Sequence, residues 1–261
     1  MNNVTETDRN GNRIIQGLWV GDRLPIMQQL SIASFLAHGH DYHLYTYTRM
    51  DKVPEGTVLK DAREILPESA VFRNAARDTY AAFSDFFRYK LLLDKGGWWA
   101  DLDMVCLRPF DFADDYVFSS EHELCLESTN SGVIKAPKGA QVIAFAWDTC
   151  QQKDKRNLTW TEVGPDLLGE SVERFGLQRH VKPAITFCAL LSDNWHFVVR
   201  PHHEFCFRPY TYAIHLWHEV WRYHGWNVDH DYAPGSLYEQ LKSKYLFKRP
   251  VEGPHHPFRV L

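Results

Sequence analysis

The stretch SDFFRYKLLLDKGGWWADLD, residues 84–103, decides the fold prediction because its periodicity changes at a double glycine. From residue 79 to residue 94 apolar side chains recur at the spacing of one helix face, which predicts an amphipathic helix. Gly96 and Gly97 end this pattern, and residues 98–107 follow as a predicted strand. The stretch therefore joins a helix to a strand that carries acidic side chains.

The sequence before this stretch indicates a parallel sheet. Residues 13–20, RIIQGLWV, predict a buried strand, residues 24–38 predict a helix that Gly39 ends, and residues 40–47 alternate like a second strand. A strand, a helix and a strand within about 35 residues favour a βαβ unit, and so an α/β fold with helices flanking a mostly parallel sheet. Further strands are predicted at residues 123–127 and 131–136, and further helices at residues 140–151 and 165–176.

The composition is that of an ordinary globular protein. The 261 residues are 44% hydrophobic and 24% charged, and the net charge of −4 removes the usual electrostatic argument for binding nucleic acid. No linker or repeat divides the chain, so we expect a disordered N-terminus over residues 1–12 and one domain over residues 13–261. The N-terminus does not resemble a signal peptide, no apolar run reaches membrane-spanning length, and the five scattered cysteines form no Cys-x-x-Cys pair. These features predict a cytoplasmic protein.

Two carboxylates in the predicted strand are the first sign of chemistry. Asp101 and Asp103 alternate onto the same face with Trp99, about 7 Å apart, and would repel each other without a nearby cation. Oxygen ligands favour Mg²⁺ or Mn²⁺, and such a site leaves positions that substrate phosphates fill. The pair predicts a nucleoside diphosphate held through a metal ion, although an Asp-x-Asp motif by itself is usually solvated surface charge.

The helix before the double glycine carries a second charged pair. Asp85 and Arg88 are three residues apart and share one helix face, where such pairs are most often exposed and contribute little stability. They also precede the predicted strand that carries Asp101 and Asp103, so a second interpretation is that they belong to the same functional site. The stretch as a whole contains Ser84-Asp85-x-x-Arg88-Tyr89, then Gly96-Gly97, then Asp101-x-Asp103.

This order and spacing resemble the signature of the DXD-containing glycosyltransferases of family 32, and, over the same segment, the sugar-transferring domains of large clostridial toxins. Weaker likenesses recur at residues 15–21, 130–137, 164–165 and 215–217. The resemblance implies a single-domain GT-A fold, Mn²⁺ or Mg²⁺ as cofactor, and a hexosyltransferase that retains anomeric configuration. It implies a nucleotide-sugar donor, with a UDP-sugar favoured over a GDP-sugar, and a glycan or lipid-linked acceptor in polysaccharide biosynthesis. It leaves peripheral membrane contact open.

The resemblance also implies roles for individual residues. Asp85, Arg88 and Asp103 would be catalytic: Asp85 and Arg88 would hold the donor sugar and its glycosidic oxygen, with Arg88 offsetting charge on the leaving diphosphate. Asp103 would ligate the metal directly, and Asp101 would reach the ribose or a metal-bound water. His215 would be a third metal or diphosphate ligand, although a lone histidine is more often structural. The implied donor-binding residues are Trp19, Val20, Ser84, Asp85, Arg88, Asp101 and Asn130.

Four positions in or near the implied site keep an alternative interpretation or a doubtful role. Trp19, implied to stack on the base, could be a buried strand tryptophan, and Asn130 begins an Asn-Ser-Gly sequence typical of a turn. Trp99 stands where relatives commonly carry Tyr, so a role that needs a phenol hydroxyl is in doubt. Asp166 follows a Gly-Pro pair and is interpreted first as a helix-start residue and only second as an acceptor contact.

Other classes of function are weighed against the transferase. A catalytically silent carbohydrate- or nucleotide-sugar-binding protein of the same fold is the first alternative, and a metal-dependent phosphohydrolase is the second. The presence of all four charged motif residues, Asp85, Arg88, Asp101 and Asp103, favours an active enzyme. Zinc hydrolysis is disfavoured because Arg222 stands where the second histidine of a His-Glu-x-x-His motif would be.

Overall fold

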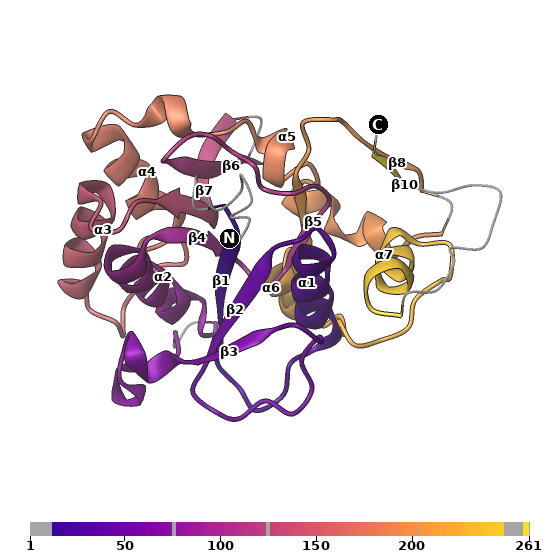
Figure 1. The fold of residues 1–261 in the computed structure, drawn as a ribbon, viewed down its shortest axis with the longest axis horizontal. Helices are drawn as coiled ribbons and strands as arrows, with labels where there is room; N and C mark the ends of the chain where they lie inside the picture. The colour runs from indigo at the N-terminus through magenta and orange to yellow at the C-terminus, as the bar shows by residue number, and fades with distance from the viewer. Residues whose placement is uncertain (1–11, 75–76, 124–125, 202, 248–257, 261) are drawn as a thin grey trace, which may run out of the picture.

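The computed structural model describes residues 12–74, 77–123, 126–201, 203–247 and 258–260, and a six-stranded sheet lies at its centre (Figure 1). The strand order is β3-β2-β1-β4-β7-β6. β3, β2, β1 and β4 run parallel, whereas β7 is antiparallel to both of its neighbours. The strands are β1 (Ile14–Trp19), β2 (Asp41–Thr46), β3 (Val58–Asp61), β4 (Gly97–Ala100), β6 (Val117–Glu123) and β7 (Leu126–Ala136).

Helices cover both faces of this sheet. The α-helices are α1 (Ile26–Ala37), α2 (Ala81–Lys95), α3 (Gln141–Gln151), α4 (Pro165–Arg174), α5 (Ala184–Phe187), α6 (His218–Tyr223) and α7 (Leu237–Tyr245). Figure 1 shows α2, α3 and α4 on one side of the sheet and α1 and α7 on the other. Two short pairs complete the fold: β5 (Met104–Cys106) with β9 (Ala213–His215), and β8 (Phe205–Phe207) with β10 (Phe258–Val260). The predicted α/β class is confirmed, and the mixed, mostly parallel sheet is the one expected of a GT-A fold.

The sheet separates two hydrophobic cores because successive side chains of a strand point to opposite faces. Ile15 and Trp98 pack into the core beneath α1, whereas Leu18 and Trp99 pack into the core beneath α2. Both tryptophans are fully buried. The predicted placement of Trp98 and Trp99 on opposite faces of the strand after the double glycine is confirmed.

The double glycine ends α2 by backbone geometry. Gly96 has a φ of 69°, in the left-handed region, and Gly97 has a φ of 88°. A Cβ atom on Gly96 would lie 2.4 Å from the backbone nitrogen of Lys138, so a side chain does not fit there. The predicted helix end at this position is confirmed.

The strand predicted over residues 98–107 is interrupted. β4 ends at Ala100, and the amide of Met104 donates to the carbonyl of Asp101 (3.0 Å), which closes a turn before β5 begins. Asp101 and Asp103 therefore lie on a turn rather than on one strand face. Of the strand predicted at residues 123–127, residue 123 ends β6, residues 126–127 begin β7, and residues 124–125 lie outside the described residues.

The other predicted strands and helices agree with the structure to within a few residues. They are β1, α1, β2 and α2 in the first part of the chain and β7, α3 and α4 in the second. β1 and β2 are parallel neighbours, and Ile14 pairs with Asp41 at the start of their register, which confirms the βαβ unit. The predicted disordered segment falls on residues 1–11, outside the described residues, except for Asn12. Asn12 is buried and its amide oxygen accepts hydrogen bonds from Trp98 Nε1 and Lys135 Nζ, so the expectation does not hold at that residue.

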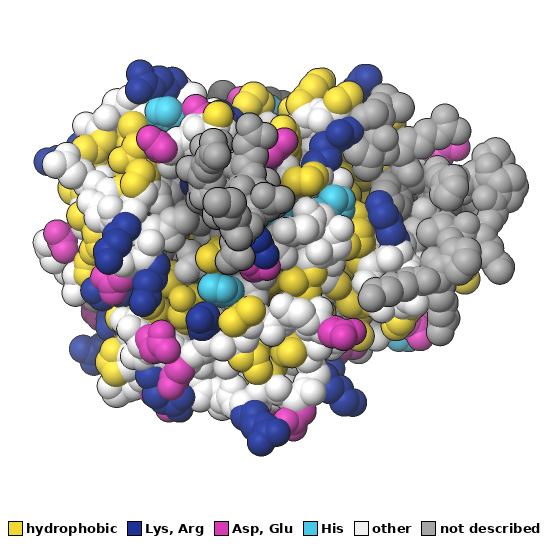
Figure 2. Space-filling model, viewed as in Figure 1, with side chains coloured by type: hydrophobic (Ala, Val, Ile, Leu, Met, Phe, Trp, Pro, Cys, Tyr) yellow, Lys and Arg dark blue, Asp and Glu magenta, His cyan; other side chains and the backbone are white. Residues whose placement is uncertain are grey.

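The described surface carries both signs of charge. Figure 2 shows Lys and Arg side chains interspersed with Asp and Glu over the face in view, without a broad patch of either sign. Within the described residues, no helix combines the length and the apolar character needed to cross a membrane.

Candidate active site

The turn after β4 is held by one backbone hydrogen bond to β7 and by another from the residue that follows β9. The amide of Asp101 donates to the carbonyl of Gly132 in β7 (2.8 Å), and the amide of Leu216, just after β9, donates to the carbonyl of Asp103 (2.9 Å). The two carboxylates thus lie at the carboxyl end of a parallel strand, the usual place for ligand sites in α/β sheets.

Three potential metal ligands meet at this turn. One atom each from Asp101, Asp103 and His215 lies within 4.8 Å of the other two. Two carboxylate oxygens and one imidazole nitrogen form a donor set suited to a divalent cation, because carboxylates suit Mg²⁺ and Mn²⁺ and imidazole suits first-row transition metals. The third ligand predicted from the sequence, His215, is therefore brought to the two aspartates by the pairing of β5 with β9.

Asp103 and His215 form a buried ion pair. His215 Nε2 lies 3.2 Å from Asp103 Oδ1, and the backbone amide of His218 donates to Asp103 Oδ2 (2.8 Å). Burial by itself would raise the pKa of Asp103, but the charge and hydrogen bond of His215, together with His218, lower that pKa to about 2. Burial opposes the charged imidazole, yet Asp103 raises the pKa of His215 well above its ordinary value. Asp103 is thus held ionised, as a metal ligand must be, whereas the imidazole of His215 would have to release its proton to bind a metal ion.

Arg88 is buried at the centre of a second network. Its side chain is 4% exposed and donates from Nη2 to Asp101 Oδ1 (2.9 Å) and from Nη1 to the carbonyl of Ser131. Nη1 also lies 3.3 Å from Asp85 Oδ1. The guanidinium therefore binds Asp101 and Asp85 together, and the interpretation of Asp85 and Arg88 as an exposed surface pair is wrong.

Trp99 contributes a contact that the sequence did not reveal. Its indole nitrogen donates to Asp101 Oδ1 (2.8 Å), and its ring lies 5.0 Å from the Arg88 guanidinium carbon. The indole N–H of Trp99 therefore orients the Asp101 carboxylate. Relatives commonly carry Tyr at this position, and Trp99 makes this contact without a phenol hydroxyl. With Arg88 on the same oxygen, Oδ2 is left as the atom of Asp101 that receives no hydrogen bond from either group.

Asp85 lies behind Arg88, against the loop that precedes α4. Its Oδ1 accepts a long hydrogen bond from the Ser131 hydroxyl (3.4 Å). A Cβ atom on Gly164 would lie 2.8 Å from Asp85 Oδ2, so the glycine allows the chain to pass directly over the carboxylate. Burial raises the pKa of Asp85 to about 6, against the opposing charge of Arg88.

The raised pKa of Asp85 predicts a pH-dependent stability. The folded chain holds this proton more tightly than the unfolded chain, so the wild type should lose stability as the pH rises from about 4 to about 6. Asp85→Asn cannot ionise, and a shift of about two pKa units corresponds to about 3 kcal/mol. The free energy of unfolding of Asp85→Asn, relative to wild type, should therefore increase by up to about 3 kcal/mol between these pH values, measured by urea denaturation.

Asp114 provides a matched control. Its hydrogen bond and ion pair with Lys182 lower its pKa, so its stabilising effect appears as the pH rises. Asp114→Asn should therefore lose stability relative to wild type as the pH rises toward about 4, and its difference from wild type should then stay nearly constant up to about pH 6, where the difference for Asp85→Asn increases. Parallel pH profiles for the two variants would contradict the assignment of a buried, proton-binding Asp85.

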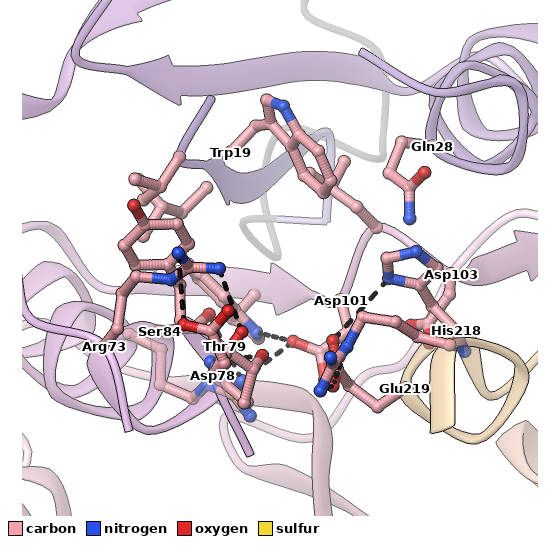
Figure 3. Close-up of a pocket in the computed structure, with 18 residues that line it drawn as sticks. Trp19, Gln28, Arg73, Asp78, Thr79, Ser84, Asp101, Asp103, His218 and Glu219 are labelled. Atoms are coloured by element: carbon pink, nitrogen blue, oxygen red, sulfur yellow. Dashed lines mark hydrogen bonds and ion pairs between the residues drawn. The ribbon is translucent and has the colours of Figure 1, made fainter. Parts of the chain in front are cut away.

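A cleft of about 320 Å³ opens beside the two networks (Figure 3). Figure 3 shows Trp19 across the cleft from Asp101, with His218 and Glu219 of α6 at one end. The lining residues are Leu18, Trp19, Val20, Gln28, Arg73, Asp78, Thr79, Tyr80, Ala81, Ser84, Arg88, Trp99, Asp101, Leu102, Asp103, His218, Glu219 and Arg222.

Six of the predicted site residues line this cleft: Trp19, Val20, Ser84, Arg88, Asp101 and Asp103. Asp85, Asn130 and His215 do not line it and lie behind its wall. Trp19 is only partly buried, and its indole nitrogen donates to the carbonyl of Arg23 (2.9 Å), so it is not a core tryptophan. Its ring centre lies 6.3 Å from that of His218.

Asn130 and Asp166 have structural partners. Asn130 lies within β7, opposite a register shift in β6, so the turn interpretation is wrong. Its side chain accepts from the amide of Gly132 (2.7 Å) and donates to Glu121 (2.7 Å), which orients it beside the metal-ligand cluster. Asp166 lies in the first turn of α4 and accepts from the Thr161 hydroxyl (2.6 Å), which confirms the helix-start interpretation.

Sequence reasoning missed the loop at one end of the cleft and the α6 side chains at the other. Arg73 and Asp78–Tyr80 belong to no motif, and the bridge between Asn74 and Thr79 brings these lining residues together. His218 and Glu219 were considered only as a zinc motif. The aromatic and acidic composition of residues 215–222 was the one signal that could have included them.

Comparisons with known proteins give one family match and several matches to solved structures. Residues 27–122 match the family model described as "Glycosyltransferase sugar-binding region containing DXD motif". No curated protein matches the chain. Among solved structures, the PaToxG glycosyltransferase is 16% identical, with a TM-score of 0.47 over 63% of this chain and 69% of that one. The apo form of the glycosyltransferase GlyE from Streptococcus pneumoniae TIGR4 is 10% identical, with a TM-score of 0.37 over 66% of this chain and 44% of that one.

The matched segment contains α1, α2 and the turn that holds Asp101 and Asp103, so it supplies most of the cleft wall and two of the three potential metal ligands. The family match rests on sequence, whereas the cluster of Asp101, Asp103 and His215 is formed by the fold. Both include the turn that carries Asp101 and Asp103. Residues 27–122 of this protein are therefore similar to the DXD-containing sugar-binding region of glycosyltransferases.

Proposed function

We propose that the protein is a retaining, metal-dependent hexosyltransferase that uses a nucleoside-diphosphate sugar. The observation that carries the proposal is the cluster of Asp101, Asp103 and His215 beside a cleft walled by Trp19 and Arg88. We favour a UDP-sugar over a GDP-sugar because the cleft volume of about 320 Å³ is near the lower end for ligand sites, and uracil is the smaller base. The proposed acceptor is a glycan or lipid-linked sugar in cytoplasmic polysaccharide biosynthesis.

The residues on the two sides of the cleft have complementary tasks in this proposal. Asp101, Asp103 and His215 would hold the metal ion, which we propose is Mn²⁺ and which, when bound, neutralises charge on the donor diphosphate. Trp19 offers a flat ring to the base, and its bond to the Arg23 carbonyl fixes the orientation of that ring. Arg88 provides a preorganised positive charge close to the position where the leaving group gains negative charge.

The transfer itself is proposed to occur on one face of the sugar. The bond between the anomeric carbon and the diphosphate oxygen breaks, the acceptor oxygen bonds to the same carbon, and the acceptor proton passes to the leaving diphosphate. A double displacement would need a carboxylate at the far face of the sugar. Asp85 does not line the cleft, which supports a role in orienting Arg88 rather than as that nucleophile.

The proposal is tested by incubating the purified protein with a panel of UDP- and GDP-sugars and Mn²⁺, with water as the slow acceptor. Release of free sugar with the donor's anomeric configuration, followed by NMR before mutarotation, supports a retaining transferase. Release of sugar 1-phosphate would identify a phosphohydrolase. Binding of a donor without turnover of any of them would favour the silent binding protein.

Trp19→Ala tests the base-stacking role. Losing one stacked ring should weaken UDP binding by about 1–3 kcal/mol in isothermal titration calorimetry with Mn²⁺ present. Trp160→Ala removes a partly exposed tryptophan that does not line the cleft and serves as the control. Equal UDP affinities for the two variants would argue against stacking on Trp19.

A further inference from the structure

A second cleft, of about 500 Å³, lies on the other side of α6. His218, Glu219 and Arg222 of α6 line the first cleft, whereas Val220 and His224, one helical turn apart, line the second. The two clefts share no lining residue. The second cleft is completed by the 3₁₀ segment Ser192–Val199, by Arg200 and by Trp226. It is therefore a separate site rather than an extension of the donor cleft.

Its apolar wall is made of aromatic rings whose positions are fixed by other rings. Trp226 is 42% exposed, yet it stacks on Tyr232 at 5.7 Å and meets Trp195 edge-on at 5.2 Å. Trp195 in turn stacks on His224 at 5.6 Å, with 18° between the planes. A large aromatic side chain held rigidly and still exposed offers contact area to a ligand at a low cost in conformational entropy.

Polar side chains of this cleft contact aromatic rings, but their polar atoms are not committed to hydrogen bonds within the described part of the protein. Among the described residues, the side chains of Asp193, His196 and His224 form no hydrogen bond or ion pair, and the guanidinium carbon of Arg200 lies 4.8 Å from the centre of the Phe197 ring. In the donor cleft, by contrast, Asp101 and Arg88 are bonded to each other. Planar donors and acceptors beside the exposed ring are thus free to bind hydroxyl groups.

The charges of the second cleft select against ionic ligands. It contains one carboxylate, Asp193, and one guanidinium, Arg200, so neither an anion nor a cation meets a field of one sign. The metal-ligand cluster of the described residues lies elsewhere, at Asp101. A neutral ligand with an apolar face and a rim of hydroxyl groups fits this combination best.

We infer that this cleft binds a neutral oligosaccharide, with one pyranose ring stacked on Trp226 and its hydroxyls bonded to Asp193, Arg200 and the two histidines. The C–H face of a pyranose is apolar and flat enough to pack on an indole ring, and its hydroxyls point outward in the ring plane. The inference goes beyond sugar transfer: it assigns a saccharide-binding site that holds a glycan away from the donor. It requires neither the metal ion nor the nucleotide.

The test is direct binding of neutral oligosaccharides to the whole chain, without metal or donor. Maltohexaose, cellohexaose and chitohexaose are titrated to about 10 mM and followed by tryptophan fluorescence and calorimetry. At least one should bind, and Trp226→Ala should weaken that binding by about tenfold or more, the loss expected for a central aromatic contact. Tyr210→Ala removes another exposed aromatic side chain outside the cleft and should leave it unchanged.

Further variants keep the result interpretable. Asp193→Asn preserves the shape of the side chain and removes its charge. This variant tests the contacts with sugar hydroxyls, should also weaken oligosaccharide binding, and replaces Trp226→Ala if that variant does not fold. Donor hydrolysis should stay at the wild-type rate in both variants, so failure of the transferase proposal would not remove this test. The inference is overturned if no oligosaccharide binds, if Trp226→Ala and Tyr210→Ala bind equally, or if light scattering shows a dimer that Trp226→Ala dissociates.

Discussion

Removing divalent metal with EDTA should abolish turnover of the nucleotide-sugar donor, and Mn²⁺ should restore it. The donor diphosphate and the two carboxylates of the Asp101–Asp103 turn are all negative, so they cannot share one site without a cation between them. Loss of a metal that neutralises a leaving diphosphate should reduce the rate by about 1000-fold or more. Initial rates of donor hydrolysis before and after chelation measure the effect, and full activity in EDTA would refute the metal role.

Single substitutions of Asp101 and Asp103 show how much each aspartate contributes to metal-dependent turnover. Asp103→Asn should lose more activity than Asp101→Asn, because Asp103 is kept ionised by His215 and His218, with a pKa lowered to about 2 despite burial. Asp101 already accepts hydrogen bonds from Arg88 and Trp99, contacts that an asparagine oxygen can still accept. Asp114→Asn, on the far edge of the sheet, serves as the control and should keep wild-type activity. The reverse order of losses would make Asp101 the principal metal ligand.

Arg88→Lys should lower turnover by about 100-fold or more, on the scale of losing one preorganised donor. A lysine keeps the positive charge but lacks the planar fork that reaches Asp101 and the Ser131 carbonyl at the same time. Because Arg88 is buried, some loss of stability is also expected, and complete removal in Arg88→Ala should cost about 3–5 kcal/mol by leaving the buried Asp85 and the partly buried Asp101 without their cation.

The comparison with an exposed arginine separates the two effects. Arg63 forms ion pairs with Asp61 and Glu68 at the surface, so Arg63→Lys should change neither turnover nor melting temperature appreciably. Turnover numbers are compared at a temperature where circular dichroism shows that each variant is folded. A folded Arg88→Lys protein with near wild-type turnover would remove the support for a bidentate role.

Local sequence patterns predicted the elements that frame the site. The apolar spacing of α1 and α2, the alternation of β1 and β2 and the double glycine at Gly96 each act over a few residues, so they can be recognised without the fold. The same patterns failed at residues 98–107. There, the backbone bonds of Asp101 and Asp103 go to β7 and to the residue after β9, and these partners are distant in sequence.

The sequence by itself determined the α/β class, the DXD segment and the list of charged residues that carry its chemistry, because these depend on residue type and on short spacing. Only the tertiary structure decided how those residues are used. Burial of Arg88 between Asp85 and Asp101 depends on α2 packing against β4 and β7, and the approach of His215 to Asp103 depends on the pairing of β9 with β5. Burial and long-range pairing set the strength and protonation of charged groups, and neither can be read from residues close together in the chain.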